Sequence, residues 1–364
     1  MTNKSLSGSD GQRKALGKGP AKGRVTMQDI ARVAECSQST VSFVLNANTS
    51  VKISDMTRKR VLEIARDLGY RPSMLQGLQD RSGGKDAIAF VIDKMTTSPE
   101  GVVMLDGVRQ VARALDALVL TAETDGNAAL EERTLTMFRD LGVQAIIYAC
   151  IFTREIKIPD GIRDARMPVI LVNCYTADGE FPAVVPGEIA GGHRATNALL
   201  AAGHRRIATI TGESFMEAAQ DRLQGYRNAL ATADIPFSPE LVVAGDWSPS
   251  AGYRGTQELM ELDVPPTAIF CQNDRMAVGC YEALKEMGLR IPEDISVVGF
   301  DDEEITRHMS PPLTSLILPS RAMGRWAVEQ IIREGGETDE RQGALVKLEC
   351  TLVSRESVTR PARG

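Results

Sequence analysis

The stretch VTMQDIARVAECSQSTVSFVLN, residues 25–46, decides how the chain begins to fold. Thr26 and Asp29 form a Thr-x-x-Asp pattern that is typical of a capped helix start, and the apolar residues after it recur at helical spacing. A tight turn ending at Ser37 follows, and Ser37 can cap a second helix, QSTVSFVL. We expect this second helix to bury one apolar face and to expose small polar residues at its N-terminal end.

Two short helices joined by a tight turn form a helix-turn-helix, whose second helix enters the major groove of DNA with its first turns against the base edges. Gln38 can pair with adenine through two hydrogen bonds, and Ser39 and Ser42 can reach bases or phosphates. Thr26 and Arg58 can contact phosphates. The same periodicity also fits an ordinary three-helix bundle with solvated polar faces, so the pattern alone leaves both interpretations open.

Charge is divided unevenly along the 364 residues. The whole chain has a net charge of −6. Residues 1–82 carry 14 basic and 7 acidic side chains, whereas the rest of the chain carries 28 basic and 41 acidic ones. A basic head on an acidic body indicates a polyanion-binding module joined to a second function, although basic arms also serve as solubilising tails.

The composition and the hydrophobic periodicity of the sequence change along the chain. Residues 1–23 predict a disordered basic arm, residues 24–70 a helical DNA-binding domain, and residues 71–86 a hinge or linker. From residue 87, short β-rich runs alternate with amphipathic helices, which predicts an α/β fold with parallel sheets in two lobes. The expected strands are 87–93, 117–122, 143–149, 168–173, 206–212, 241–245, 267–272 and 295–300. The expected helices between them are 101–115, 127–141, 190–203, 218–233, 249–262 and 274–288.

Several classes of protein fit this sequence poorly. The apolar runs are too short to span a bilayer and the N-terminus has no apolar signal core, which favours a cytoplasmic protein without membrane association. The six cysteines form no C-x-x-C pair and fit buried, reduced thiols. Phosphate-loop and nucleophile motifs are absent, and the three histidines lack metal-ligand spacing. We therefore expect that the protein is not an enzyme and that it binds neither a metal ion nor a cofactor.

The opening stretch and ISDMTRKRVLEIARDLGYRPS (53–73) closely resemble the DNA-binding head of the lactose-repressor (LacI/GalR) family of transcriptional regulators. The resemblance continues through AGHRRIATITG (202–212), NDRMAVG (273–279) and PEDISVVGFDD (292–302), and covers about residues 24–358. It implies a homodimeric repressor whose helix-turn-helix head binds a pseudo-palindromic double-stranded DNA operator. A two-lobed domain, similar to type I periplasmic binding proteins, would bind a small-molecule effector, a sugar or sugar derivative, and control the head allosterically.

The resemblance also implies how the effector-binding and dimerisation domain, residues 87–360, is divided. The chain would cross between the lobes three times. Lobe one would hold about residues 87–187 and 318–347, and lobe two about 188–316 and 348–360.

Further DNA contacts follow from the resemblance. Thr40 and Asn46 lie in the matching S-x-S-T-V-S-x-V-L-N string. Leu78 matches the residue that wedges into a minor-groove base step, with Leu75 as the competing register. The family commonly carries Arg where this chain has Phe43, which can pack on a thymine methyl group but has no donor for guanine. The operator preference should therefore differ, unless Phe43 belongs to the core.

Ligands of such α/β folds bind outside the carboxyl ends of parallel strands. The polar residues at or just past predicted strand ends are Asp93, Tyr148, Asn173, Asn273 and Asp301. The resemblance adds Arg222 and Trp247, and together these residues supply the carboxylates, amides, guanidinium and aromatic face that sugar recognition needs.

Structural alternatives apply to these candidates. Asn273 and the pair Asp301 and Asp302 can cap helices, and Trp247 can be plain core. A buried Arg222 needs a partner. An Asp that is common in the family near Pro186 and Gly187 is missing here.

Two other functions compete with a regulator. A solute-binding protein would need a signal peptide and no basic head, and both observations oppose it. An α/β enzyme with an accessory DNA module would need a nucleophile–base pair or a phosphate loop, and neither is visible.

Overall fold

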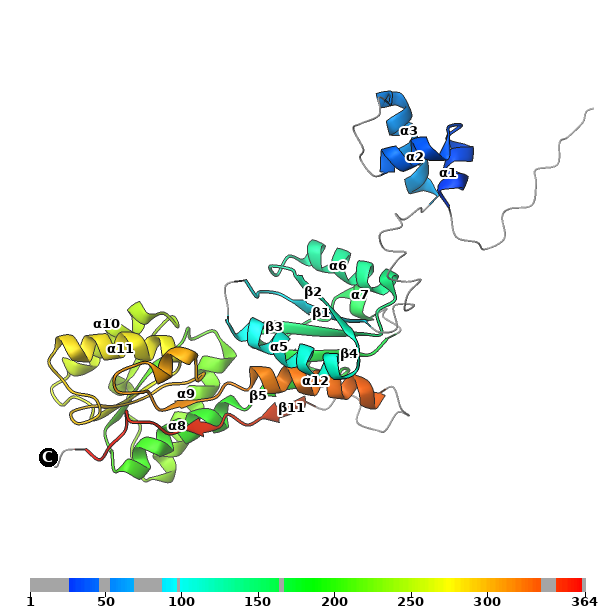
Figure 1. The fold of residues 1–364 in the computed structure, drawn as a ribbon. Coiled ribbons are helices and arrows are strands. Elements are labelled where there is room, and N and C mark those ends of the chain that lie inside the picture. Colours follow the sequence, from blue (N-terminus) through cyan, green and yellow to red (C-terminus); the bar gives the residue numbers. More distant parts are fainter. Residues whose placement is uncertain are drawn as a thin grey trace, which may run out of the picture. The chain divides into compact units, whose positions relative to one another are not determined.

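The computed structural model describes residues 26–45, 53–68, 87–96, 99–163, 167–334 and 345–361. The chain divides into two compact units, Met1–Arg81 and Ser82–Gly364 (Figure 1). Among these residues, no helix combines the length and the apolar character needed to cross a membrane.

The described residues of the first unit form three helices, α1 (Met27–Val33), α2 (Gln38–Leu45) and α3 (Asp55–Asp67). The predicted caps are confirmed. The Asp29 backbone N–H donates to Thr26 Oγ1 at 3.2 Å while the Thr26 N–H donates back to the Asp29 carboxylate, and the Thr40 N–H donates to Ser37 Oγ at 3.1 Å. The helices pack around one small apolar core. Its buried members are Ile30, Ala31, Ala34, Val41, Val44, Val61 and Ala65.

The first sheet of the second unit has six parallel strands in the order β11-β5-β4-β3-β1-β2 (Figure 1). The strands are β1 (Ala87–Ile92), β2 (Leu118–Glu123), β3 (Ala145–Glu155), β4 (Val169–Tyr175), β5 (Ala183–Pro186) and β11 (Leu345–Leu348). Helices α5 (Pro99–Ala114) and α12 (Ser320–Glu334) cover one face. Helices α6 (Ala128–Leu141) and α7 (Asp160–Arg163) cover the other.

The second sheet has four parallel strands in the order β7-β6-β8-β9. The strands are β6 (Ile207–Thr211), β7 (Val242–Ala244), β8 (Ala268–Cys271) and β9 (Ser296–Val298). Helices α8 (Glu188–Ala202) and α9 (Glu217–Thr232) pack on one face, and α10 (Pro249–Met260) and α11 (Asp274–Glu286) on the other. The other elements among the described residues of this unit are an antiparallel pair, β10 (Ser315–Leu316) and β12 (Leu352–Val353), and two short 3₁₀ helices, η1 (Pro239–Leu241) and η2 (Glu304–Arg307).

The predicted fold class is confirmed, because all eight expected strands and all six expected helices of the second unit are present. Four short strands, β5, β10, β11 and β12, were not expected from the sequence, and neither were α7 and α12. The chain passes from one sheet to the other between β5 and α8, between β10 and α12, and between β11 and β12.

Candidate functional site

A cavity of about 680 Å³ lies between the two sheets of the second unit, at the carboxyl ends of their strands. Six of the seven predicted effector residues line it: Asp93, Asn173, Arg222, Trp247, Asn273 and Asp301. Tyr148 is not among the lining residues. Its ring is buried in the core on the α6 side of the first sheet, and its hydroxyl donates to Glu131.

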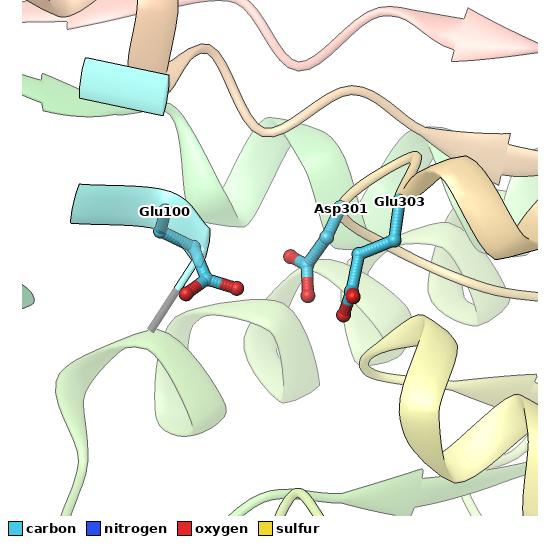
Figure 2. Close-up of side chains that lie close together, drawn as sticks. All are labelled: Glu100, Asp301 and Glu303. Atoms are coloured by element: carbon cyan, nitrogen blue, oxygen red, sulfur yellow. The ribbon is translucent and has the colours of Figure 1, made fainter. Parts of the chain in front are cut away.

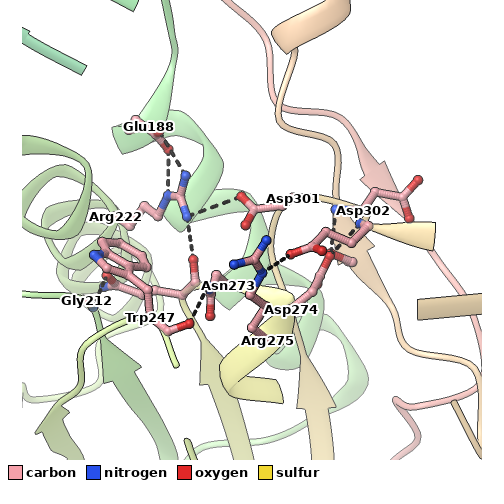
Figure 3. Close-up of polar contacts among 12 residues, drawn as sticks. Glu188, Gly212, Arg222, Trp247, Asn273, Asp274, Arg275, Asp301 and Asp302 are labelled. Atoms are coloured by element: carbon pink, nitrogen blue, oxygen red, sulfur yellow. Dashed lines mark hydrogen bonds and ion pairs between the residues drawn. The ribbon is translucent and has the colours of Figure 1, made fainter. Parts of the chain in front are cut away.

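Arg222 lines the cavity and is almost fully buried, and Figure 3 shows the polar contacts around it. Its Nε donates to Glu188 Oε2 at 2.7 Å and its Nη2 to Glu188 Oε1 at 2.9 Å, while Nη1 donates to the Gln272 carbonyl. Asp301 Oδ1 lies 3.6 Å from Nη1. Burial lowers the pKa of this guanidinium, but Glu188 and Asp301 more than offset that effect, so the pKa lies above its usual value. The buried Arg therefore has a partner, Glu188, that the sequence did not reveal.

A close crossing of α8 and α9 places Glu188 beside Arg222. A Cβ on Gly192 would lie 2.2 Å from the Arg222 carbonyl oxygen, and one on Gly225 would lie 2.1 Å from the Ile189 carbonyl oxygen. Only glycine permits this approach. Glu188 stands in the first turn of α8, where the helix dipole also favours a negative charge.

Trp247 supplies an aromatic face. Its indole lies so close to the backbone after β6 that a Cβ on Gly212 would fall 1.9 Å from the ring (Figure 3). Arg222 Cζ is 5.6 Å from the Trp247 ring and 3.7 Å from the Phe300 ring. Trp247 also packs against the core of the second sheet, so it is at once a lining residue and partly a core residue.

The two amide side chains that line the cavity, Asn273 and Asn173, also form hydrogen bonds with backbone groups. Asn273 caps α11, which confirms the structural role that the sequence also allowed for it. Its Oδ1 accepts a hydrogen bond from the Met276 N–H at 2.9 Å, and its Nδ2 donates one to the Trp247 carbonyl. Asn173 Oδ1 accepts from Thr153 Oγ1 at 2.6 Å, and its Nδ2 donates to two carbonyls of β3.

Three carboxylates from opposite sides of the cavity come together in Figure 2. One oxygen each from Glu100, Asp301 and Glu303 lies within 4.8 Å of the others. Burial raises the pKa of Asp301 well above its usual value, while Arg222 acts in the opposite direction. Glu303 accepts from Arg275 Nε at 3.0 Å. A cation could be held by this geometry, but Asp301 and Glu303 each already have a guanidinium beside them.

Left-handed backbone is concentrated around the cavity. Asn173, Trp247, Asp301 and Asp302 have φ of +57°, +65°, +109° and +54°, and the first three line the cavity. Non-glycine residues rarely adopt this conformation, and such strain tends to gather at functional sites. Arg355 holds Asp302 in place at 2.6 Å, so Asp302 is not a free helix cap.

The N-terminal end of α2 offers a polar surface on the first unit. Gln38 and Ser39 are exposed, and Ser42 and Phe43 are half-buried. Phe43 is not part of the core that Val41 and its neighbours form. The face of α2 that points away from the core therefore carries polar side chains and one aromatic ring, that of Phe43.

The other predicted DNA contacts are placed as follows. Arg58 is half-buried on α3. Thr26 Oγ1 donates to Asp29 at 2.7 Å, and Thr40 Oγ1 lies 2.8 Å from Ser37 Oγ, so both hydroxyls take part in helix caps. Asn46 and Leu78 lie outside the described residues.

Comparison with known proteins gives a family for this arrangement. Residues 26–73 match the family described as bacterial regulatory proteins, lacI family, and residues 196–358 match a periplasmic binding protein-like domain. The ribose operon repressor of Haemophilus influenzae is 34% identical over 337 residues, covering 92% of this chain and 98% of that protein. The chain belongs to the LacI family. LacI-family proteins are transcriptional regulators, not enzymes.

Two further relatives extend the comparison. The HTH-type transcriptional repressor CytR of Escherichia coli strain K12 is 31% identical over 340 residues, which are 91% of this chain and 96% of that one. The structure of a complex of the regulator CelR with cellobiose is 29% identical, with a TM-score of 0.64, and covers 92% of this chain and all of that one.

Proposed function

We propose that this LacI-family chain is a homodimeric, sequence-specific DNA-binding repressor, controlled by a small carbohydrate-like effector in the cavity between the two sheets. The observation that carries the proposal is the convergence of six predicted residues on one cavity with a buried guanidinium in its wall. The CelR–cellobiose complex supports a carbohydrate as the class of ligand.

The head would bind the operator through α2. Its exposed N-terminal end meets the geometric requirement for insertion into the major groove, where Gln38, Ser39 and Ser42 would read or flank bases. The remaining proposed DNA contacts are Thr26, Thr40, Phe43, Asn46, Arg58 and Leu78. Since a helix-turn-helix dimer meets two half-sites, the operator should have two-fold symmetry.

The second unit would act as the sensor. We assign lobe one to about residues 87–187 and 318–347, lobe two to about 188–316 and 348–360, and the hinge to residues 71–86. An effector held by residues from both lobes would favour one lobe arrangement over another. The population of the DNA-competent state then changes by the difference in the effector's affinity for the two arrangements. The chain would act where the DNA is, in the cytoplasm, and without catalysis.

Selection from random duplex DNA tests the proposal. The full-length protein is incubated with a randomised library at two salt concentrations, and the retained duplexes are sequenced. We expect a pseudo-palindromic site whose binding weakens steeply with salt, because phosphate contacts release counterions. Retention without any enriched sequence would show that the head does not read DNA.

A further inference from the structure

We propose that Glu188 sets the charge class of the effector: by neutralising Arg222, it makes the cavity accept polyols without an anionic group and exclude phosphate esters and carboxylates. The inference rests on the proposed function of the cavity as the effector site. It concerns the charge of the ligand, which the fold leaves open.

Every cationic side chain that lines the cavity within the described part of the chain already contacts a carboxylate. The four pairs are Lys94–Asp125 at 2.8 Å, Arg154–Asp93 at 2.8 Å, Arg275–Glu303 at 3.0 Å and Arg222–Glu188 at 2.7 Å. An anionic ligand would therefore have to displace a carboxylate from its partner before it gained a cation.

Carboxylates also outnumber cations in the lining. Seven acidic residues face these four cations: Asp93, Glu100, Asp125, Glu188, Glu213, Asp246 and Asp301. At a separation of a few ångströms in a partly buried site, like charges repel strongly because water screens them poorly. A phosphate group placed there adds to this excess of negative charge, whereas a hydroxyl or an ammonium group does not.

The geometry of Arg222 points the same way. Arginine binds phosphates and carboxylates best through two parallel N–H groups on one edge of the guanidinium. In this chain Glu188 occupies the Nε–Nη2 edge, at 2.7 and 2.9 Å, and the Gln272 carbonyl accepts from Nη1. Asp301 Oδ1 also lies 3.6 Å from Nη1, so an oxyanion would meet a guanidinium that two carboxylates and a carbonyl already surround.

Glu188 is more deeply buried than Asp93 and Asp301: its side chain is 2% exposed, against 10% and 11%. The side chain of Arg222 is 4% exposed. Removing the charge of Glu188 would leave Arg222 as a buried cation without its strongest partner, next to a cavity. Such a cation attracts an anion, so a single residue change should reverse the charge preference of the site.

The test is thermal unfolding of the full-length protein with matched ligands, followed by calorimetric titration of every ligand that stabilises it. The panel holds ribose, glucose, galactose and cellobiose, together with ribose 5-phosphate, glucose 6-phosphate, glucuronate and glucosamine, all at one ionic strength. We expect stabilisation only by uncharged or amino sugars. A phosphate ester or sugar acid that binds more tightly than its uncharged parent would overturn the inference.

Variants sharpen the test. Glu188→Gln should gain at least about tenfold in affinity for the phosphate esters, while Glu213→Gln, which removes the same charge from the same cavity and leaves the Glu188–Arg222 pair intact, should not. If Glu188→Gln does not fold, the wild-type panel alone decides. Binding of an anion that alters DNA affinity would refute the inference and leave the proposed function standing. Failure of every ligand, whatever its charge, to stabilise the protein would count against both.

Discussion

Glu188 binds Arg222 along one whole edge of its guanidinium, through two hydrogen bonds of 2.7 and 2.9 Å, in a pair almost fully removed from solvent. The pair joins the first turn of α8 to the middle of α9 and forms part of the cavity wall. Because both charged groups are removed from water, the stability of each in the folded state depends on its pairing with the other.

A double-mutant cycle measures this dependence. Glu188→Gln and Arg222→Gln should each lower the free energy of unfolding by about 3–5 kcal/mol, because each leaves a buried charge without its partner. The double variant should lose clearly less than the sum of the two. The same cycle on the exposed pair Arg290–Asp294 is the control and should show only weak coupling. Equal coupling in the two pairs, measured by urea unfolding, would argue against a buried, mutually dependent pair.

The crossing of α8 and α9 gives a second prediction. Gly192→Ala places a methyl group where the Arg222 carbonyl oxygen stands, so the helices must separate. We expect a loss of about 1–3 kcal/mol in unfolding free energy, as in other overpacked sites, together with weaker effector binding. Ala201→Gly, on the exposed side of α8, should cost about 1 kcal/mol and leave effector binding unchanged. Unaltered effector affinity in Gly192→Ala would show that the crossing does not position the cavity wall.

The sequence predicted the fold well because buried parallel strands are continuous apolar runs, such as those of β1 and β4, separated by amphipathic helices. It missed β10 and β12, which have two residues each and carry no periodic signal. Their pairing joins segments far apart in the chain, and only the completed fold defines it.

The site was less accessible to prediction. The sequence predicts that Tyr148 stands at a strand end, but β3 continues to Glu155, so Tyr148 lies inside the strand and faces the core under α6. The role of Glu188 has no signal in the sequence, because its pairing with Arg222 depends on a helix crossing and not on local spacing. The left-handed backbone at Trp247 and Asp301, which turns these residues at the strand ends, also has no signature in a single sequence.

If α2 contacts the bases, replacing Gln38 should weaken operator binding. Gln38→Ala should weaken binding to the selected operator by about 5- to 150-fold, because a bidentate base contact is worth about 1–3 kcal/mol. Its thermal stability should stay close to that of the wild type, since the side chain is exposed. Gln28→Ala, an exposed glutamine on α1, is the matched control. Fluorescence anisotropy that showed equal losses for the two variants would remove Gln38 from the interface.

Phe43 makes a separate prediction about sequence preference. Because it lies outside the core of the head, Phe43→Arg should leave the fold intact and change the selected DNA. We expect one position in each half-site to change from thymine to guanine, as an apolar methyl contact gives way to a guanidinium contact. Repeating the library selection with the variant measures this, and an unchanged site would place Phe43 away from the bases.

We expect the buried carboxyl of Asp274 to make the free energy of unfolding depend on pH. Burial raises its pKa to about 7, although Ser315 and the Glu303 N–H donate to its carboxylate. Since the folded pKa lies above the unfolded value of 3.8, its stabilising contribution is complete below about pH 4 and is lost as the pH rises through 7.

Relative to Asp274→Asn, the wild type should therefore lose up to about 4 kcal/mol of unfolding free energy between pH 4 and 8. Asp294→Asn removes an exposed carboxyl whose pKa is lowered to about 2 by its hydrogen bond to Arg290, and it should leave the slope above pH 5 unchanged. Parallel pH profiles for the wild type and Asp274→Asn would contradict the assignment.

The central claim is that the cavity controls the head, and one titration tests it most directly. The affinity of the full-length protein for its selected operator is measured at fixed salt, with and without a ligand that stabilises the protein, for the wild type and for Arg222→Lys. The account predicts a change in operator affinity of about 5- to 150-fold in the wild type. In Arg222→Lys, the ligand-free affinity should be retained and the ligand response lost. A ligand that stabilises the wild type but leaves its operator affinity unchanged would contradict the account.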